Sequence, residues 1–303
     1  MKRIAFIIHG RIAKNAKLTR DIATVFNGME YNLFATTEAQ QATTLTQQAV
    51  SAGYNYIICI GGDGSLNEVV NGFMQSNTVL SNNIYLGLLP YGTGNDFAKT
   101  MGISKNIAEL KQYIETDSYK ATDIGEVNYT NRSSDNATRY FINITDVGMG
   151  GLAAEKINSY PKWLPSNIAY QLAILSTLLS YKKKDMTADA DTFSYAGRTM
   201  NIIVANGKYF GSGLGIAPHA QTNDGKLAIV IAADISLWDY IMNIGTVRKC
   251  QKVQHPQMLY HEAKTITVTA KEPMSIDMDG EFIGYSPMRI SIAPGCINFL
   301  CKA

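Results

Sequence analysis

The chain has 303 residues, of which 46% are hydrophobic and 17% are charged, and its formal net charge is +2. Such a composition excludes a disordered or fibrous chain and supplies enough material for one large domain or two ordinary ones. With a small net charge and no long basic block, nucleic acid is not expected as a partner. No apolar run is long enough to span a bilayer.

The chain begins as a cytoplasmic protein would. Residues 3–8 form a short apolar run that predicts a first strand and not a signal peptide. The cysteines lack the close pairing of a redox or zinc motif, and Cys59 lies inside an apolar segment. We therefore expect a cytoplasmic protein with reduced cysteines, with peripheral contact at the inner face of the membrane left open.

The first 120 residues alternate between predicted strands and helices. A strand at 3–8 turns at His9-Gly10-Arg11, a second strand covers 31–36, and a helix covers 38–52. This βαβ order predicts a parallel sheet with right-handed crossovers. Ligands of such sheets bind outside the carboxyl ends of the strands.

A glycine-rich turn follows the next predicted strand, at 56–60. The turn reads Gly61-Gly62-Asp63-Gly64-Ser65, and apolar residues at helical spacing come after it. Its glycines allow positive φ and leave no Cβ between the main chain and an incoming phosphate, and the following helix adds its positive N-terminal end. Asp63 could face a nucleotide or its metal; a tight turn without a ligand is the alternative.

A second glycine-rich turn follows the predicted strand at 84–90. It reads Tyr91-Gly92-Thr93-Gly94-Asn95-Asp96 and again opens a predicted helix. Two such turns at the ends of neighbouring strands would form one phosphate-binding rim.

The second half of the chain is rich in strand-like runs and indicates a largely antiparallel β domain beginning near residues 120–130. One helical segment, 168–181, interrupts these strands. It is almost wholly apolar, follows Trp163-Leu164-Pro165 and precedes Lys182-Lys183-Lys184. A helix packed over the β domain is one interpretation, and a helix lying in a membrane interface is the other. The predicted strands are 140–147, 199–205, 226–232, 265–270, 274–279 and 288–293.

The two glycine-rich turns together resemble the catalytic domain of the diacylglycerol kinase family. The first continues as Leu66-Asn67-Glu68-Val69-Val70-Asn71-Gly72, and the second as Phe97-Ala98. That family includes bacterial soluble lipid kinases, sphingosine kinases and ceramide kinases, and it is distantly related to NAD kinases. The resemblance implies an α/β N-terminal domain with a parallel Rossmann-like sheet and a mainly antiparallel β-sandwich C-terminal domain. The implied limits are 1–125 for the nucleotide-binding domain and 126–290 for the β-rich domain, with 291–303 returning to the first.

The resemblance also implies which residues meet the nucleotide. One departure concerns the first turn, where His9-Gly10 replaces the Asn-Pro of the family, with Arg11, Lys14 and Lys17 as nearby cations; whether these cations meet phosphate or lie on the surface of a first helix is left open. The implied nucleotide-binding residues are Thr36, Gly61, Gly62, Asp63, Gly64, Ser65, Asn67, Gly92, Thr93, Gly94 and Asn95.

Two further motifs in the β-rich half fit the resemblance. In the family, Asp-Gly-x-Leu holds a structural magnesium ion, which carries over to Asp224 and the main chain at Lys226 and Leu227; a plain β-turn is the alternative. Asp279-Gly280-Glu281 matches the motif whose glutamate is assigned as proton acceptor. The resemblance thus makes Glu281 the catalytic base and Asp279 the next candidate, against the alternative of a solvated hairpin.

The sequence therefore predicts an ATP-dependent lipid kinase that uses Mg²⁺ and phosphorylates diacylglycerol or a related lipid. An NAD kinase-like soluble kinase and a non-catalytic nucleotide- or lipid-binding module are the alternatives. A P-loop ATPase is excluded, because Gly-x-x-x-x-Gly-Lys-[Ser/Thr] does not occur. Contact with the membrane surface and formation of a homodimer are left open.

Overall fold

A computed structural model shows the fold and describes residues 2–76, 83–157, 160 and 166–302. The chain divides into two compact units. Unit 1 comprises Met1–Ile124 with Pro294–Ala303, and unit 2 comprises Gly125–Ala293. Each unit has a hydrophobic core of its own.

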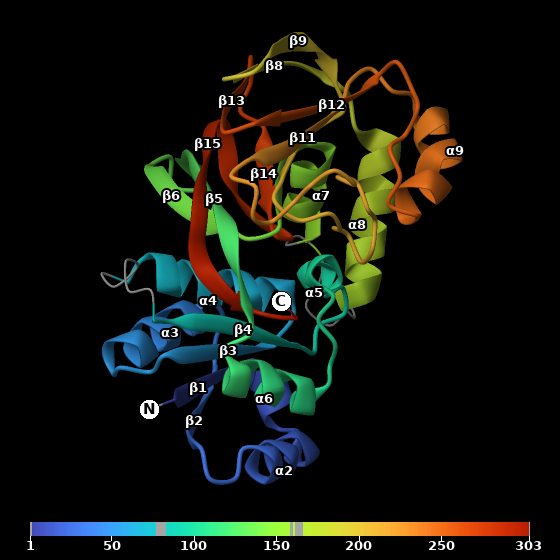
Figure 1. The fold of residues 1–303 in the computed structure, drawn as a ribbon. Coiled ribbons are helices and arrows are strands. Elements are labelled where there is room, and N and C mark those ends of the chain that lie inside the picture. The colour runs from blue at the N-terminus through green and yellow to red at the C-terminus, as the bar shows by residue number, and fades with distance from the viewer. Residues whose placement is uncertain (1, 77–82, 158–159, 161–165, 303) are drawn as a thin grey trace. The chain divides into compact units, whose positions relative to one another are not determined.

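Unit 1 is built on a parallel sheet in the order β4-β3-β1-β2, and the end of β15 pairs with β4. Helices α2 and α6 cover one face, where they pack on Phe6 and Ile58, and α3 and α4 lie on the other (Figure 1). Because the strands are parallel, their carboxyl ends meet at one edge. The elements are β1 (Arg3–Ile8), α1 (Gly10–Ala13), α2 (Ala16–Val25), β2 (Glu30–Ala35), α3 (Gln41–Ser51), β3 (Tyr56–Gly61), α4 (Asp63–Met74), β4 (Tyr85–Pro90), α5 (Asp96–Met101) and α6 (Ile107–Thr116).

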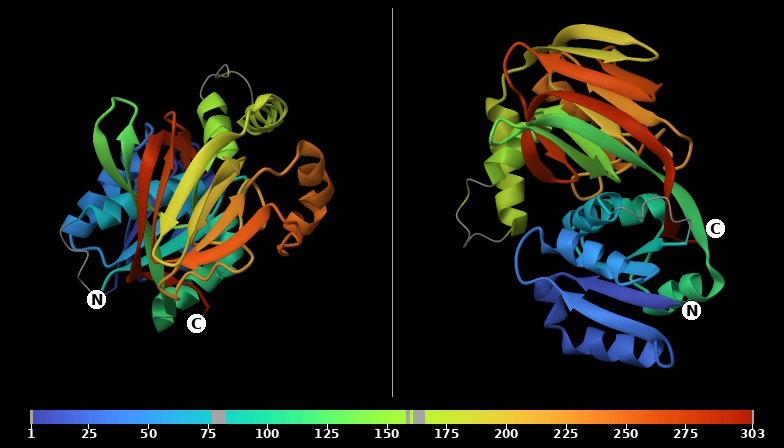
Figure 2. Two further views of the ribbon diagram at one scale, coloured as in Figure 1. Left: turned by 90° about the horizontal axis from the view of Figure 1, so that it is seen from above. Right: turned by 90° about the vertical axis from the view of Figure 1, so that its left-hand side faces the viewer.

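Unit 2 is a mainly antiparallel β structure. Strands β12, β11, β10, β7, β14 and β15 follow one another, β13 pairs with β15 and β8, and β5 pairs with β15 and β6 (Figures 1 and 2). Apolar side chains from these strands fill the space between them. Two of its strands are shared, since β5 begins and β15 ends in unit 1. The elements are β5 (Tyr119–Asn131), β6 (Asn136–Phe141), β7 (Ile144–Gly148), α7 (Met149–Ile157), α8 (Ser166–Ser180), β8 (Lys184–Ala190), β9 (Ser194–Thr199), β10 (Asn201–Ala205), β11 (Leu227–Ala232), α9 (Leu237–Arg248), β12 (Met258–Ala263), β13 (Thr265–Ala270), β14 (Ser275–Met278) and β15 (Glu281–Leu300).

The predicted fold class is confirmed: a parallel α/β unit precedes a mainly antiparallel β unit. Two details of the prediction are wrong. The runs 140–147 and 199–205 are not single strands, because the chain breaks between β6 and β7 and between β9 and β10. Helix 168–181 is present as α8, but α7 and α9 also interrupt the strands.

Helix α8 packs against α7, and its Ala173 and Thr177 are fully buried, whereas Leu172 and Leu179 are exposed. The aromatic segment Trp163-Leu164-Pro165, which the sequence placed before this helix, lies outside the described residues. Within the described ranges, no helix combines the length and the apolar character that a membrane crossing requires.

Candidate functional site

A cavity of about 680 Å³ opens at the carboxyl ends of β1 and β2 in unit 1. This volume lies in the range of sites for small molecules and cofactors. The cavity is lined by Ile7, His9, Gly10, Arg11, Lys14, Ala35, Thr36, Thr37, Glu38, Ala39, Ala42, Ser65 and Glu68. The structure therefore gathers the first turn, the end of β2 and the first turns of α4 around one space.

The first turn and Thr36 are in close contact. Gly10 N donates to Thr36 Oγ1 at 3.0 Å, and a Cβ on Gly10 would lie 2.1 Å from Thr36 O, so only glycine fits there. Of the nearby cations, Arg11 and Lys14 line the cavity, and Lys17 is not among its described lining residues. The lining also includes Glu38 and Glu68, so two positive and two negative side chains meet around this cavity.

The two glycine-rich turns pack directly against each other. A Cβ on Gly62 would lie 2.9 Å from Gly92 Cα, and a Cβ on Gly92 would lie 2.4 Å from Gly62 Cα. The glycines of the first turn would allow positive φ, but neither Gly61 nor Gly62 adopts it, and Gly92 in the second turn does not either. These glycines instead allow two backbones to touch.

Several of the predicted nucleotide-binding side chains hold the turns in place. Asp63 begins α4, and its Oδ1 accepts from Phe97 N at 3.1 Å, which ties the first turn to α5. Asn95 Oδ1 accepts from Gly92 N at 2.9 Å, and Asn95 Nδ2 donates to Gly92 O at 2.7 Å. Asn67 is fully buried and accepts from Asn71.

The predicted residues thus fall into two groups. Thr36 and Ser65 line the cavity, while Asn67 lies inside the protein. No residue from 92 to 95 is among the described lining residues, although Thr93 is exposed. Glu68, which sequence reasoning did not select, lines the cavity and accepts from Gln40 N and Ala42 N at the start of α3.

Unit 2 gathers carboxyl groups around the turn from β14 to β15. Asp279 lies just past β14 with φ 48°, so it is outside the strand alternation that orients Asp277. Its carboxylate accepts from Ile142 N, Asn143 N and Ile144 N at 3.2, 3.2 and 2.9 Å. Asp279 therefore fixes the segment that joins β6 to β7.

Glu281 is held more loosely than Asp279. It begins β15, its side chain is 36% exposed, and its Oε2 lies 3.5 Å from Arg139 Nη2 on β6. A half-buried carboxylate that a guanidinium orients can accept a proton from a hydroxyl group that lies within hydrogen-bond distance.

Two family models match this chain. The model of the diacylglycerol kinase catalytic domain matches residues 3–127, and the model of the YegS C-terminal NAD kinase beta sandwich-like domain matches residues 143–301. The chain belongs to the diacylglycerol kinase family. As a family member, it is a kinase that phosphorylates an alcohol group.

Relatives of this family member span most of its length. It is 29% identical to the diacylglycerol kinase of Bacillus subtilis over 86% of this chain and 82% of the relative. It is 26% identical to that of Staphylococcus haemolyticus over 95% of this chain and 84% of the relative. A crystal structure of a Bacillus anthracis protein, 24% identical, gives a TM-score of 0.78 over 99% of this chain and 95% of that one. The structure of a diacylglycerol kinase of the same organism, 19% identical, gives a TM-score of 0.71 over 99% of this chain and 97% of that one.

The magnesium motif expected in this family lies in a turn before β11. Asp224 is exposed, and its Oδ1 accepts from Lys226 N at 3.0 Å. Among the described residues, no three His, Cys, Asp or Glu side chains cluster as a metal site. One carboxylate with main-chain carbonyls and water fits Mg²⁺, which keeps much of its hydration shell in proteins.

Two aspartates that face each other in unit 2 were not predicted as a pair from the sequence. Asp146 on β7 lies directly opposite Asp277 on β14, and Asp146 is fully buried. Burial raises the pKa of Asp146 to about 7; burial and the charges of Asp146, Asp279 and Glu281 raise the pKa of Asp277 well above its usual value. Sequence spacing could not show this pair, because the two residues are 131 positions apart and meet only through strand register.

Proposed function

We propose that this family member transfers the γ-phosphate of ATP to the hydroxyl group of a lipid, diacylglycerol or a related lipid. The observation that carries the proposal is the cavity at the carboxyl ends of the unit 1 strands, where Arg11 and Lys14 lie with the first turn of α4. Cations and a helix N-terminus form a natural phosphate site. The names of the relatives from Bacillus subtilis and Staphylococcus haemolyticus support the choice of acceptor.

In this proposal unit 1 is the nucleotide domain. The main chain at 61–65, the second turn at 92–95, Thr36 and Ser65 bind the nucleotide, and Arg11 and Lys14 neutralise phosphate charge. Asp63, Asn67 and Asn95 contribute through the shape of the turns, since their described hydrogen bonds run to the protein's own groups.

Unit 2 supplies the proton acceptor in this proposal. Glu281, oriented by Arg139, takes the proton of the lipid hydroxyl as the hydroxyl oxygen attacks the γ-phosphorus, the bond from that phosphorus to the bridging oxygen breaks, and ADP leaves. Asp279 shapes the turn on which Glu281 lies. Mg²⁺ that accompanies ATP supplies positive charge to the transferring phosphoryl group. A second, structural Mg²⁺ would be held by Asp224 and the main chain at Lys226 and Leu227.

The test is transfer of labelled γ-phosphate from ATP with magnesium to a panel of acceptors in mixed detergent micelles. The panel contains diacylglycerol, phosphatidylglycerol, sphingosine, ceramide and an isoprenoid alcohol, with NAD as a soluble acceptor. The proposal predicts label in a lipid. Label in NAD alone would show a soluble kinase instead, and ATP binding without label in any acceptor would contradict the lipid assignment.

A further inference from the structure

Helix α9 exposes large apolar side chains to solvent. Trp238 is 68%, Ile241 46% and Met242 66% exposed, and no residue of α9 is buried. The helix lies at the outer edge of unit 2 in Figure 1 and in the left panel of Figure 2. Exposed apolar side chains gathered on one helix commonly mark an interaction surface.

These side chains share one face with two cations. Trp238, Ile241, Met242, Arg248 and Lys249, which we call the α9 stripe, fall within an arc of about 120° at ~100° per residue. Arg248 and Lys249 are exposed and have no ion-pair partner among the described residues. Asp239, the acidic residue of α9, points about 100° away from Trp238 and is used in the capping box with Ser236.

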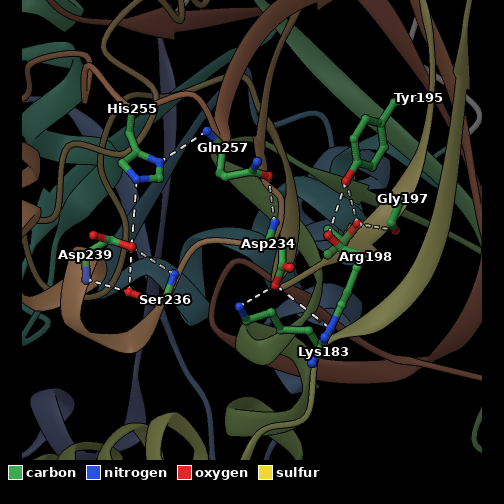
Figure 3. Close-up of polar contacts among 10 residues, drawn as sticks. Lys183, Tyr195, Gly197, Arg198, Asp234, Ser236, Asp239, His255 and Gln257 are labelled. Carbon is green, nitrogen blue, oxygen red and sulfur yellow. Dashed lines mark hydrogen bonds and ion pairs between the residues drawn. The ribbon is translucent and has the colours of Figure 1, made fainter.

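A polar network anchors the start of α9 to the rest of unit 2 (Figure 3). Asp239 accepts from Ser236 Oγ at 2.5 Å and lies 3.8 Å from His255 Nε2. Asp234, three residues before the helix, pairs at 2.5 Å with Lys183, which follows α8. The network holds the start of α9 and uses none of the five side chains of the α9 stripe.

We propose that the α9 stripe docks on the surface of an anionic lipid bilayer. Tryptophan beside aliphatic side chains suits the boundary between head groups and acyl chains, and unpaired arginine and lysine suit anionic head groups. A bilayer satisfies both halves of the stripe at once, since a helix lying flat inserts its apolar residues while its cations meet the head groups. The inference rests on the proposed function in one respect: a lipid acceptor resides in such a bilayer.

The test compares the wild-type protein with Trp238→Ser/Ile241→Ser/Met242→Ser and with Arg248→Glu/Lys249→Glu. The matched control is Leu33→Ser, because Leu33 is also exposed, at 40%, but lies on β2 of unit 1. Each protein is sedimented with vesicles of phosphatidylglycerol and phosphatidylcholine, and with vesicles of phosphatidylcholine alone. In a Trp163→Phe background Trp238 is the one remaining tryptophan, and its fluorescence is recorded.

The proposal predicts that the wild type and the Leu33 control bind anionic vesicles, and that both stripe variants bind at least about tenfold more weakly. Trp238 emission should shift to shorter wavelength with anionic vesicles only. Equal vesicle binding by all four proteins would overturn the proposal. So would a wild type that sediments as a dimer, becomes monomeric in the apolar variant and ignores vesicles, because the stripe would then join two copies.

A kinase assay separates this inference from the proposed function. With the lipid acceptor in detergent micelles, the stripe variants should keep wild-type transfer rates; with the same lipid in anionic vesicles, their rates should fall at least about tenfold. No transfer by the wild type in micelles would count against the lipid kinase and leave the vesicle sedimentation result standing. Variants slowed equally in micelles and vesicles would overturn the docking role.

Discussion

Asp279 and Glu281 are two residues apart, but their surroundings differ and indicate different roles. Asp279 is 8% exposed, and its carboxylate accepts from three main-chain N–H groups, whereas Glu281 makes one long, partly buried ion pair. Hydrogen bonds to a buried charge contribute more to stability than an exposed ion pair does. We therefore expect Asp279 to position the turn and Glu281 to perform chemistry.

Asp279→Ala should lower the free energy of unfolding by on the order of 3 kcal/mol, because three buried N–H groups lose their acceptor. Glu281→Ala should change it by less than about 1 kcal/mol. Urea denaturation followed by circular dichroism measures both. Equal stability losses in the two variants would show that the turn does not depend on Asp279.

The raised pKa of Asp146 predicts that the stability of the protein depends on pH. Burial raises its pKa in the folded protein to about 7, while an unfolded aspartate titrates near ~3.9. Between these values the folded state holds a proton that the unfolded state has released, so the free energy of unfolding falls as pH rises from ~4 to ~7. Asp146→Asn should reduce this dependence and stabilise the protein at pH 8 by up to about 4 kcal/mol, while Asp277, whose pKa is also raised, keeps a dependence of the same sign.

Urea denaturation at pH 5 and pH 8 tests this prediction. Asp135→Asn serves as the matched control, since Asp135 is exposed on the turn after β5 and should leave the dependence unchanged. A wild-type slope retained in Asp146→Asn would show that Asp146 does not carry the effect.

At the scale of elements, the contact between the two glycine-rich turns gives a prediction for the nucleotide site. Gly92→Ala places a Cβ 2.4 Å from Gly62 Cα, which the backbone must move to accommodate. ATP affinity should fall by roughly tenfold or more, as measured by calorimetric titration. Gly245→Ala is the control: nothing lies within 4 Å of its Cβ, and α9 should gain about 0.5–1 kcal/mol with ATP binding unchanged.

Elements with a clear burial pattern could be predicted from the sequence, and those without one could not. The strands at 3–8 and 265–270 match β1 and β13 residue for residue, since their apolar and β-branched residues face a core. Helix α9 was not predicted, because no residue in it is buried and its apolar residues do not follow the periodicity of a core-facing helix. Its capping box, Ser236 with Asp239, was the signal that could have found it.

The candidate site shows a similar division. The turns at 61–65 and 92–95 could be located by motif, and Thr36 and Ser65 do line a cavity. The motif could not show that Asp63 and Asn95 hydrogen-bond to the protein itself, because such bonds depend on tertiary contacts between turns. For the same reason the ion pair between Arg139 and Glu281 could not be predicted from the sequence.

For the whole molecule, the C-terminal segment ties the end of the chain into unit 1. Ile297, Phe299 and Leu300 are at most 1% exposed, and the Phe299 ring lies 5.1 Å from that of Phe97. Deleting 294–303 removes three large buried side chains, each worth roughly 2 kcal/mol or more, which is a large share of a domain's stability. We expect loss of ATP binding and a lower thermal midpoint by circular dichroism.

Deleting 302–303 alone is the control for that truncation, because Lys302 is exposed. It should leave both ATP binding and the thermal midpoint as in the full chain. Full ATP binding by the longer deletion would show that unit 1 folds without the returning segment.

The central claim is that this family member transfers phosphate from ATP to a lipid hydroxyl with Glu281 as the proton acceptor. The most direct measurement is labelled phosphate transfer in lipid micelles by the wild type and Glu281→Gln side by side, with ATP binding measured in both. We predict label in lipid with the wild type, and transfer reduced at least about a hundredfold in Glu281→Gln with ATP affinity unchanged. Full transfer by Glu281→Gln would contradict the assignment of the base, and no lipid labelling by a wild type that binds ATP would contradict the claim as a whole.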